Sequence, residues 1–175
     1  MIRLISKEVQ RKRETGFSII ELLVVMTIIV IMSSVVMVSL SLSRAKARSA
    51  RQKTDLKLTA LALQSYYIDN SSYPTTGGVW YSSESGDTYS DNGGNYIPGL
   101  APVYMDALPR SRGGPATCGV GSKNAYLYRS DGINYKLLMN CGPDGTWTSS
   151  DEFYDPVRTT WAWAICSNSS TCATW

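Results

Sequence analysis

Residues 16–42 read GFSIIELLVVMTIIVIMSSVVMVSLSL, and this stretch decides how the chain is built. From Phe17 onward its only charged side chain is Glu21. A helix needs about 20 mainly apolar residues to cross a hydrocarbon core about 30 Å thick. A cleaved secretory signal has a shorter apolar core, which ends in small residues such as Ala-x-Ala. Residues 17–42 therefore predict a membrane-spanning helix rather than an ordinary signal peptide.

Basic residues flank this apolar run on both sides. Residues 1–16 carry five basic and two acidic side chains, which account for the whole formal net charge of +3. Six more basic residues follow the run: Arg44, Lys46, Arg48, Arg51, Lys53 and Lys57. Because both flanks are basic, the positive-inside rule gives no orientation. The cysteines favour a C-terminal part outside the cytoplasm, since disulfides persist in oxidising compartments.

The composition excludes several kinds of function. The 175 residues include no histidine, so Ser/His/Asp catalysis, Cys/His catalysis and histidine-ligated zinc are all excluded. Four widely spaced cysteines without a CxxC pair are typical of disulfides in an exported domain. Three connectivities are open, and sequence order suggests that Cys118 pairs with Cys141 and Cys166 with Cys172.

The helical pattern continues beyond the apolar run, through residues 43–70. Residues 44–69 contain no Pro or Gly and are rich in good helix formers. An apolar stripe at spacings of three and four residues comprises Leu56, Ala60, Leu63 and Tyr67. The sequence DNSSYP at 69–74 reads as the end of the helix. We therefore expect an amphipathic continuation that packs against a partner surface.

Residues 71–175 differ from the helix in composition, and they predict a small, polar domain, which we call the head. Two β-prone runs, at 124–129 and 133–139, surround a Gly-containing turn and predict a hairpin. A further short strand is expected at 161–166, where large and small residues alternate. The core of such a head is thin, so we expect disulfides to supply part of its stability. The fold class is therefore α+β.

The junction Gly16-Phe17-Ser-Ile-Ile-Glu21-Leu, placed between a basic leader and an apolar helix, resembles that of type IV pilin-like proteins. Residues 63–76, LQSYYIDNSSYPTT, are similar to the helix exit of type II secretion major pseudopilins, and residues 101–109 are more loosely similar. The resemblance implies a pilin fold, in which a long N-terminal helix packs on a small antiparallel sheet. It also implies that a prepilin peptidase removes residues 1–16 and methylates the new N-terminus at Phe17. The family often carries a helix-breaking Pro and a Gly at two positions that are Val38 and Val30 in this chain.

Glu21 needs a reason to lie in an apolar helix, because an acidic residue at a bilayer centre costs about 2.5–3.5 kcal/mol. In the family, a Glu at this position pairs with the N-terminal amine of a neighbouring subunit and sets the axial register. The simpler interpretation is a carboxylate that reaches the membrane interface. The implied partners are prepilin peptidase, other copies, minor pilins or pseudopilins, the lipid bilayer, and an inner-membrane assembly platform with its ATPase motor.

The resulting hypothesis is a structural subunit of a type II secretion pseudopilus or a type IV pilus, and not an enzyme. It would be a single-pass protein of the bacterial inner membrane with its C-terminus outside, and later part of a filament. The competing class is a monomeric anchored protein whose head binds a ligand or performs hydrolysis. DNA binding by residues 44–57 is less favoured than pairing with acidic residues of neighbouring subunits.

Calcium is the only cofactor that the sequence suggests. The suggestion comes from an acid-rich stretch and from the resemblance to major pseudopilins. Major pseudopilins use calcium in their C-terminal loops, although the two sequences cannot be aligned over that site. The candidate ligands in this chain are Asp144, Asp151, Glu152 and Asp155. A solvated acidic loop is the simpler interpretation of these residues.

Overall fold

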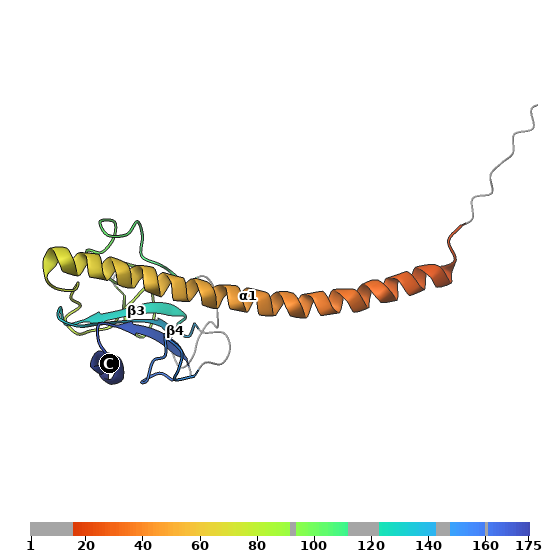
Figure 1. The fold of residues 1–175 in the computed structure, drawn as a ribbon. Helices are drawn as coiled ribbons and strands as arrows, with labels where there is room; N and C mark the ends of the chain where they lie inside the picture. Colours follow the sequence, from red (N-terminus) through yellow and green to blue (C-terminus); the bar gives the residue numbers. More distant parts are fainter. Residues whose placement is uncertain (1–15, 92–93, 112–122, 143–147, 160) are drawn as a thin grey trace, which may run out of the picture. The chain divides into compact units, whose positions relative to one another are not determined.

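The computed structural model describes residues 16–91, 94–111, 123–142, 148–159 and 161–175. The chain divides into two compact units, Met1–Leu42 and Ser43–Trp175. The long helix α1, Ile19–Asn70, begins in the first unit and ends in the second (Figure 1). One continuous helix therefore contributes to both units, as the uninterrupted helical pattern predicts.

In the first unit, the described residues form the beginning of α1 and the three residues before it. The helix starts with a hydrogen bond from the Leu22 amide to the Ser18 carbonyl, at 3.1 Å. It continues without interruption through Val30 and Val38, where the family often carries Gly and Pro. Both of those residues weaken helices, so their replacement by Val fits the unbroken helix.

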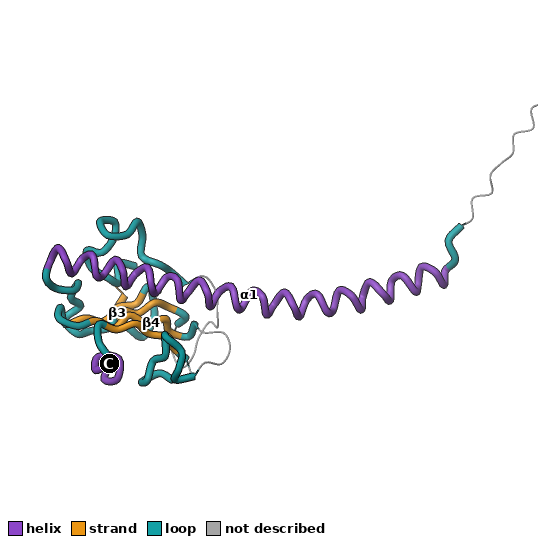
Figure 2. The backbone as a smooth tube through the Cα atoms, viewed as in Figure 1, coloured by secondary structure: helices purple, strands orange, loops and turns teal. Residues whose placement is uncertain are grey.

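The second unit contains a five-stranded sheet in the order β2-β1-β3-β4-β5. Its strands are β1 Tyr81–Ser82, β2 Ser90–Asp91, β3 Ala125–Ser130, β4 Tyr135–Asn140 and β5 Ala162–Cys166. They are drawn in orange in Figure 2, where β3 and β4 are labelled. Neighbouring strands are antiparallel except β1 and β2, which are parallel. The α+β fold class is confirmed. The two-residue strands β1 and β2 and the short helix α2, Ser169–Thr174, were not predicted.

The predicted hairpin is the centre of this sheet. Strands β3 and β4 pair from Ala125 opposite Asn140 to Ser130 opposite Tyr135. The Asp131 carboxylate closes the turn, because its Oδ1 accepts hydrogen bonds from the amides of Ile133, at 2.9 Å, and Asn134, at 2.7 Å. Gly132 has φ of 92°, a conformation that suits glycine. Local turn chemistry therefore fixes the register of the two longest strands.

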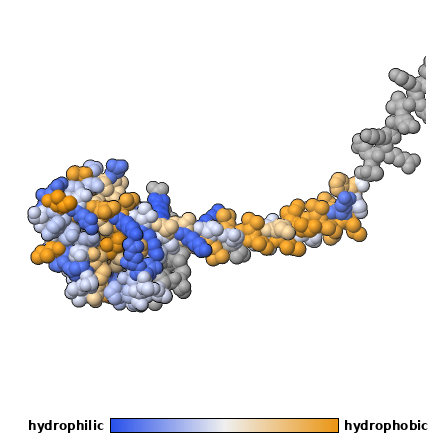
Figure 3. Space-filling model, viewed as in Figure 1, coloured by the Kyte–Doolittle hydropathy of each residue, from blue (hydrophilic) through white to orange (hydrophobic). Residues whose placement is uncertain are grey.

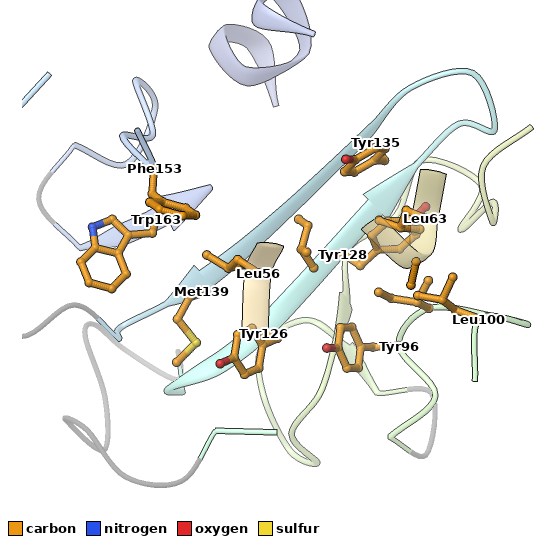
Figure 4. Close-up of a cluster of buried hydrophobic side chains, with 13 residues drawn as sticks. Leu56, Leu63, Tyr96, Leu100, Tyr126, Tyr128, Tyr135, Met139, Phe153 and Trp163 are labelled. Carbon is orange, nitrogen blue, oxygen red and sulfur yellow. The ribbon is translucent and has the colours of Figure 1, made fainter. Parts of the chain in front are cut away.

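The main core lies between the second part of α1 and the sheet (Figure 4). Leu56 and Leu63 are fully buried against Tyr126 and Tyr128 of β3. The opposite face of the sheet has a smaller cluster, made of Ala125, Leu127, Leu138, Ala162 and Ala164. Both faces of the hairpin are thus covered, which explains why its strands are apolar on both sides.

The predicted stripe on α1 is correct for Leu56, Ala60 and Leu63 and wrong for Tyr67. The Tyr67 side chain is 43% exposed and packs on Tyr73, with 4.7 Å between ring centroids. The reason is that Tyr67 lies in the last turn of the helix, where the chain folds back beside it. The helix ends at Asn70, followed by Ser71 in the left-handed region, whose amide bonds to the Tyr67 carbonyl.

Candidate assembly site

Three predicted functional residues, Gly16, Phe17 and Glu21, lie together at the start of α1. Gly16 and Phe17 precede the helix, and Glu21 is the acidic residue of its first turn. A carboxylate in the first turn is favourable, because the unpaired amides give this end of a helix a partial positive charge. Cleavage after Gly16 would place a free α-amine at Phe17, about one helical turn before this carboxylate.

The fold itself does not need a glycine at position 16. A Cβ atom placed there would meet nothing within 4 Å. Gly16 also lacks the positive φ that distinguishes several glycines of the head. Neither packing nor backbone conformation therefore accounts for a glycine at this position.

The apolar surface that follows is fully available to a partner. The most hydrophobic window of α1 has a mean hydropathy of 2.7, and none of it is buried. Phe17 is 82% exposed, Leu22 56% and Val35 66%. Figure 3 shows this apolar surface as a nearly continuous band of hydrophobic residues along the first part of the helix. An exposed apolar surface of this extent marks a membrane or protein interaction site.

Comparison with known proteins agrees with this geometry. The prokaryotic N-terminal methylation motif matches residues 11–42, which include the Gly16–Phe17 junction and Glu21. Through this motif the chain is similar to the type IV pilin-like proteins. It is membrane-anchored through one apolar helix.

Type II secretion system core protein G of Klebsiella pneumoniae is 29% identical to this pilin-like chain over 142 residues, covering 81% of the chain and 93% of the relative. The protein of the same name from Escherichia coli K12 is 29% identical over 141 residues, covering 80% and 89%. The Vibrio cholerae relative is 38% identical over 65 residues, covering 37% and 44%. No solved structure matches the chain.

The head of this pilin-like protein contains the disulfide Cys166–Cys172, which joins the end of β5 to α2. Its two Cα atoms are 5.6 Å apart, within the usual range for a disulfide. This is the pairing that sequence order suggests for these two residues. Cys141 is also disulfide-bonded. Cys118, its suggested partner, lies outside the described residues, so that pairing stays a prediction.

The three acidic calcium candidates that the structure describes, Asp151, Glu152 and Asp155, do not group around one point. Asp151 pairs with Lys53 at 3.1 Å, Glu152 pairs with Lys57 at 2.9 Å, and Asp155 pairs with a different lysine in the core. Within the described ranges, no three His, Cys, Asp or Glu side chains group as metal ligands. Asp144 lies outside those ranges. The described acidic residues of this stretch therefore do not fit a calcium ion, because lysines already neutralise them.

Sequence reasoning missed the buried cation Lys136. Lys136 and Asp155 are both fully buried, and the Lys136 ammonium lies 2.8 Å from the Asp155 carboxylate. The same ammonium donates to the backbone carbonyls of Cys172, at 2.9 Å, and Trp175, at 2.6 Å. Burial lowers the pKa of Lys136, while the nearby Asp155 opposes this shift. The only sequence signal was a lysine inside an otherwise apolar strand.

Lys136 holds the C-terminal segment of the head to the sheet. Its ammonium donates hydrogen bonds to three oxygen atoms, one of the Asp155 carboxylate and two of the backbone at Cys172 and Trp175. Arg158 reinforces this arrangement, since its guanidinium lies 3.4 Å from Asp155 and donates to the Trp175 carbonyl at 3.0 Å. With the disulfide, this cluster explains how so polar a C-terminal stretch is ordered.

Proposed function

We propose that the processed chain is a structural subunit of a type II secretion pseudopilus. The observation that supports this most directly is the Gly16–Phe17 junction, one turn before Glu21, at the start of an exposed apolar helix. The relatives named type II secretion system core protein G support the choice of filament, because two of them align over most of both chains.

Processing creates the charge that Glu21 needs. We propose that prepilin peptidase cuts after Gly16 and transfers a methyl group to the new amine of Phe17. The amine remains basic after methylation, so each subunit carries one positive and one negative group close together in sequence. Inside a bundle of apolar helices the dielectric constant is low, which strengthens attraction between opposite charges. Glu21 of one subunit would then pair with the Phe17 amine of its neighbour.

This pair matters because the apolar helix surface cannot direct assembly by itself. Lipid tails are about as apolar as leucine side chains, so moving the helix from lipid into a bundle gains little hydrophobic free energy. Close packing and polar pairs must then provide most of the selectivity. A lone carboxylate in each helix fixes the axial register, since a shifted neighbour would leave it unpaired in an apolar environment.

The proposed orientation has the head outside the cytoplasm and the leader inside. The Cys166–Cys172 disulfide supports this proposal, because disulfides persist in oxidising compartments. The leader would then face a membrane-embedded prepilin peptidase from the cytoplasmic side. The other proposed partners are minor pseudopilins and an inner-membrane assembly platform driven by an ATPase.

The first test is mass spectrometry of the N-terminal peptide of the protein purified from its native membrane. We expect a peptide that begins at N-methylated Phe17. An intact leader, in cells with an active prepilin peptidase, would contradict the proposal. It would favour the competing class, a monomeric anchored protein whose head binds a ligand or catalyses hydrolysis.

The second test separates processing from assembly. Glu21→Gln keeps the size of the side chain and removes its charge, so we expect normal cleavage at Gly16 and loss of filaments. Glu152→Gln is the matched control, because it removes one carboxylate from the exposed Lys57 pair in the head. Filaments of normal yield from Glu21→Gln would show that the carboxylate does not set the register.

A further inference from the structure

The charges of this chain are strongly segregated along the sequence of the head. Residues 43–57 carry six basic side chains and one acidic side chain. Residues 58–109 carry five acidic side chains and no Lys or Arg. The basic stretch occupies the beginning of the head's part of α1, and Asp69 lies at the end of the same helix. Arg44 and Asp69 are therefore roughly 38 Å apart along the helix axis, at about 1.5 Å per residue.

The basic stretch divides into two groups by what its side chains contact. Lys53 and Lys57 pair with Asp151 and Glu152 of the same head, so they serve the fold. Arg44 and Lys46 pair with no carboxylate among the described residues, and both are exposed. The part of the basic stretch nearest the apolar helix is therefore the part without such a partner.

Four arginines converge on one pocket of about 360 Å³. Arg44, Arg48 and Arg51 reach it from one face of α1, and Arg110 reaches it from a loop far away in sequence. Among the described residues, the carboxylate that lines it is Asp55, which lies 3.7 Å from Arg51 and accepts a hydrogen bond from the Tyr126 hydroxyl at 2.7 Å. Asp55 already pairs with Arg51, so Arg44 and Arg110 give the described lining of the pocket an excess of positive charge, which favours an anionic ligand.

The opposite charge gathers near the end of the helix. Asp69 and Asp106 are both exposed, and we refer to these two residues as the acidic end. Tyr104 connects their segments, because its ring packs on Tyr66 at 5.2 Å between centroids and its hydroxyl accepts a hydrogen bond from Asn70 at 3.1 Å.

We propose that the arginine pocket binds the acidic end of a second copy of this chain. The proposal rests on the proposed function and names a second contact between subunits, separate from the pair formed by Phe17 and Glu21. Pocket and acidic end are different surfaces of the same head, so a head-to-tail contact can join successive copies. Head-to-tail contacts generate open helical filaments when the rotation between copies does not close, and this is the arrangement that fits the proposed function. Carboxylates on the acidic end match guanidinium groups in geometry as well as charge.

Charge reversal tests this contact in cells that assemble the wild-type chain into filaments. The pocket-reversed chain carries Arg44→Glu and Arg51→Glu, and the end-reversed chain carries Asp69→Arg and Asp106→Arg. We expect each to reduce the yield of sheared filaments at least about tenfold, because like charges then meet across the interface. The chain with all four substitutions restores complementarity, and we expect it to regain most of the wild-type yield.

A matched single control is available on the same helix. Lys46→Glu makes the same charge change as Arg44→Glu two residues away, on a side chain that does not line the pocket. We expect Arg44→Glu to reduce the filament yield more than Lys46→Glu does. Thermal unfolding of every variant checks that the head is folded. N-terminal mass spectrometry checks that processing is intact.

The outcomes distinguish this inference from the proposed function. If the wild-type chain is processed but forms no filaments, the proposed function fails. If wild-type filaments form and the reversed chains assemble equally well, this contact is wrong while the function stands. Loss of filaments from the pocket-reversed chain alone, without rescue by the four substitutions, would assign the pocket to another anion such as a lipid phosphate, and would also overturn the proposal.

Discussion

The two parts of α1 use apolar residues in opposite ways. In the first part, residues 19–42, nearly every position is apolar and exposed. In the second part, residues 43–70, few positions are large and apolar, yet Leu56 and Leu63 are fully buried. One continuous helix therefore has one part that packs on its own head and another that has no core to join. The second part is stabilised by contacts within the chain, whereas the stability of the first part depends on the lipid or protein around it.

This difference separates folding from assembly. Substitutions in the second part should change the free energy of unfolding of the head. Substitutions in the first part should leave that free energy unchanged and alter only membrane insertion or filament formation. Most helical stability in proteins comes from the packing of one face, so a helix without such a face depends on lipid or on neighbouring helices.

Removal of residues 1–42 should have the largest effect on the protein, because it separates the head from the apolar part of α1. Every residue of the two core clusters lies at position 56 or later, so we expect residues 43–175 to fold as a water-soluble monomer. The fragment should lose membrane association and filament assembly completely. Circular dichroism and sedimentation of the purified fragment measure both properties. An unfolded fragment would show that the apolar part of α1 supports the head.

Lys136→Met should cause a large destabilisation of the head by a single substitution. Removing one partner of a buried ion pair typically costs about 3–5 kcal/mol, because the remaining charge is unpaired. Arg158 still lies near Asp155, so we expect a value in the lower part of that range. Urea unfolding of the fragment at neutral pH measures the effect.

Two further variants test that explanation. Lys53→Met removes a partly exposed partner of Asp151, and we expect it to cost only about 0.2–1 kcal/mol. Adding Asp155→Leu to Lys136→Met removes the second buried charge and should recover part of the loss. If the double variant is instead less stable than Lys136→Met, by as much as a second unpaired group would cost, then Lys136 and Asp155 contribute to stability separately.

Leu63→Ala should destabilise the head by about 2–5 kcal/mol, the usual cost of a cavity at a fully buried leucine. Leu61→Ala, two residues earlier, should have little effect, because that side chain is 57% exposed. The same urea measurement compares the two variants. Equal losses from both would contradict the division of the helix surface into a buried and an exposed face.

The sequence predicted those features that depend on local patterns. The apolar run and the helical spacing located α1, and the β-prone runs with their turn located the hairpin and β5. Each of these patterns lies within a short stretch of sequence. The short strands β1 and β2 carry no such repeat. Strand β1 pairs with the edge of β3, far away in sequence, and β2 pairs in turn with β1. Lys136 was missed for a related reason, since its oxygen partners at Asp155, Cys172 and Trp175 come together only in the fold.

The candidate site shows the same division. The Gly16, Phe17 and Glu21 motif is contiguous, so sequence reasoning could find it. The acidic calcium candidates show the same limit, because the lysines that pair with the described carboxylates come from α1 and β4, far away in sequence. The pocket formed by Arg44, Arg48, Arg51 and Arg110 likewise required the fold, which brings residue 110 to the helix.

Asp131→Ala should have only a small effect, because it changes an exposed turn. The lost carboxylate accepts hydrogen bonds from the Ile133 and Asn134 amides, and we expect a cost of about 0.5–1 kcal/mol at neutral pH. Asp131→Asn keeps an acceptor oxygen and should cost less. Urea unfolding of the fragment distinguishes the three chains.

The pH dependence of this effect has a definite sign. Hydrogen bonds from the amides, with that of Asn134 the largest contribution, lower the pKa of Asp131 below its ordinary value of 3.8. A carboxylate with a lowered pKa in the folded state stabilises the fold above the unfolded pKa, and this contribution disappears as the pH falls through the folded pKa. The difference between wild type and Asp131→Ala should therefore be constant above about pH 5 and shrink below 3.8. A difference that persists at the lowest pH would mean that the turn depends on the shape of the side chain and not on its charge.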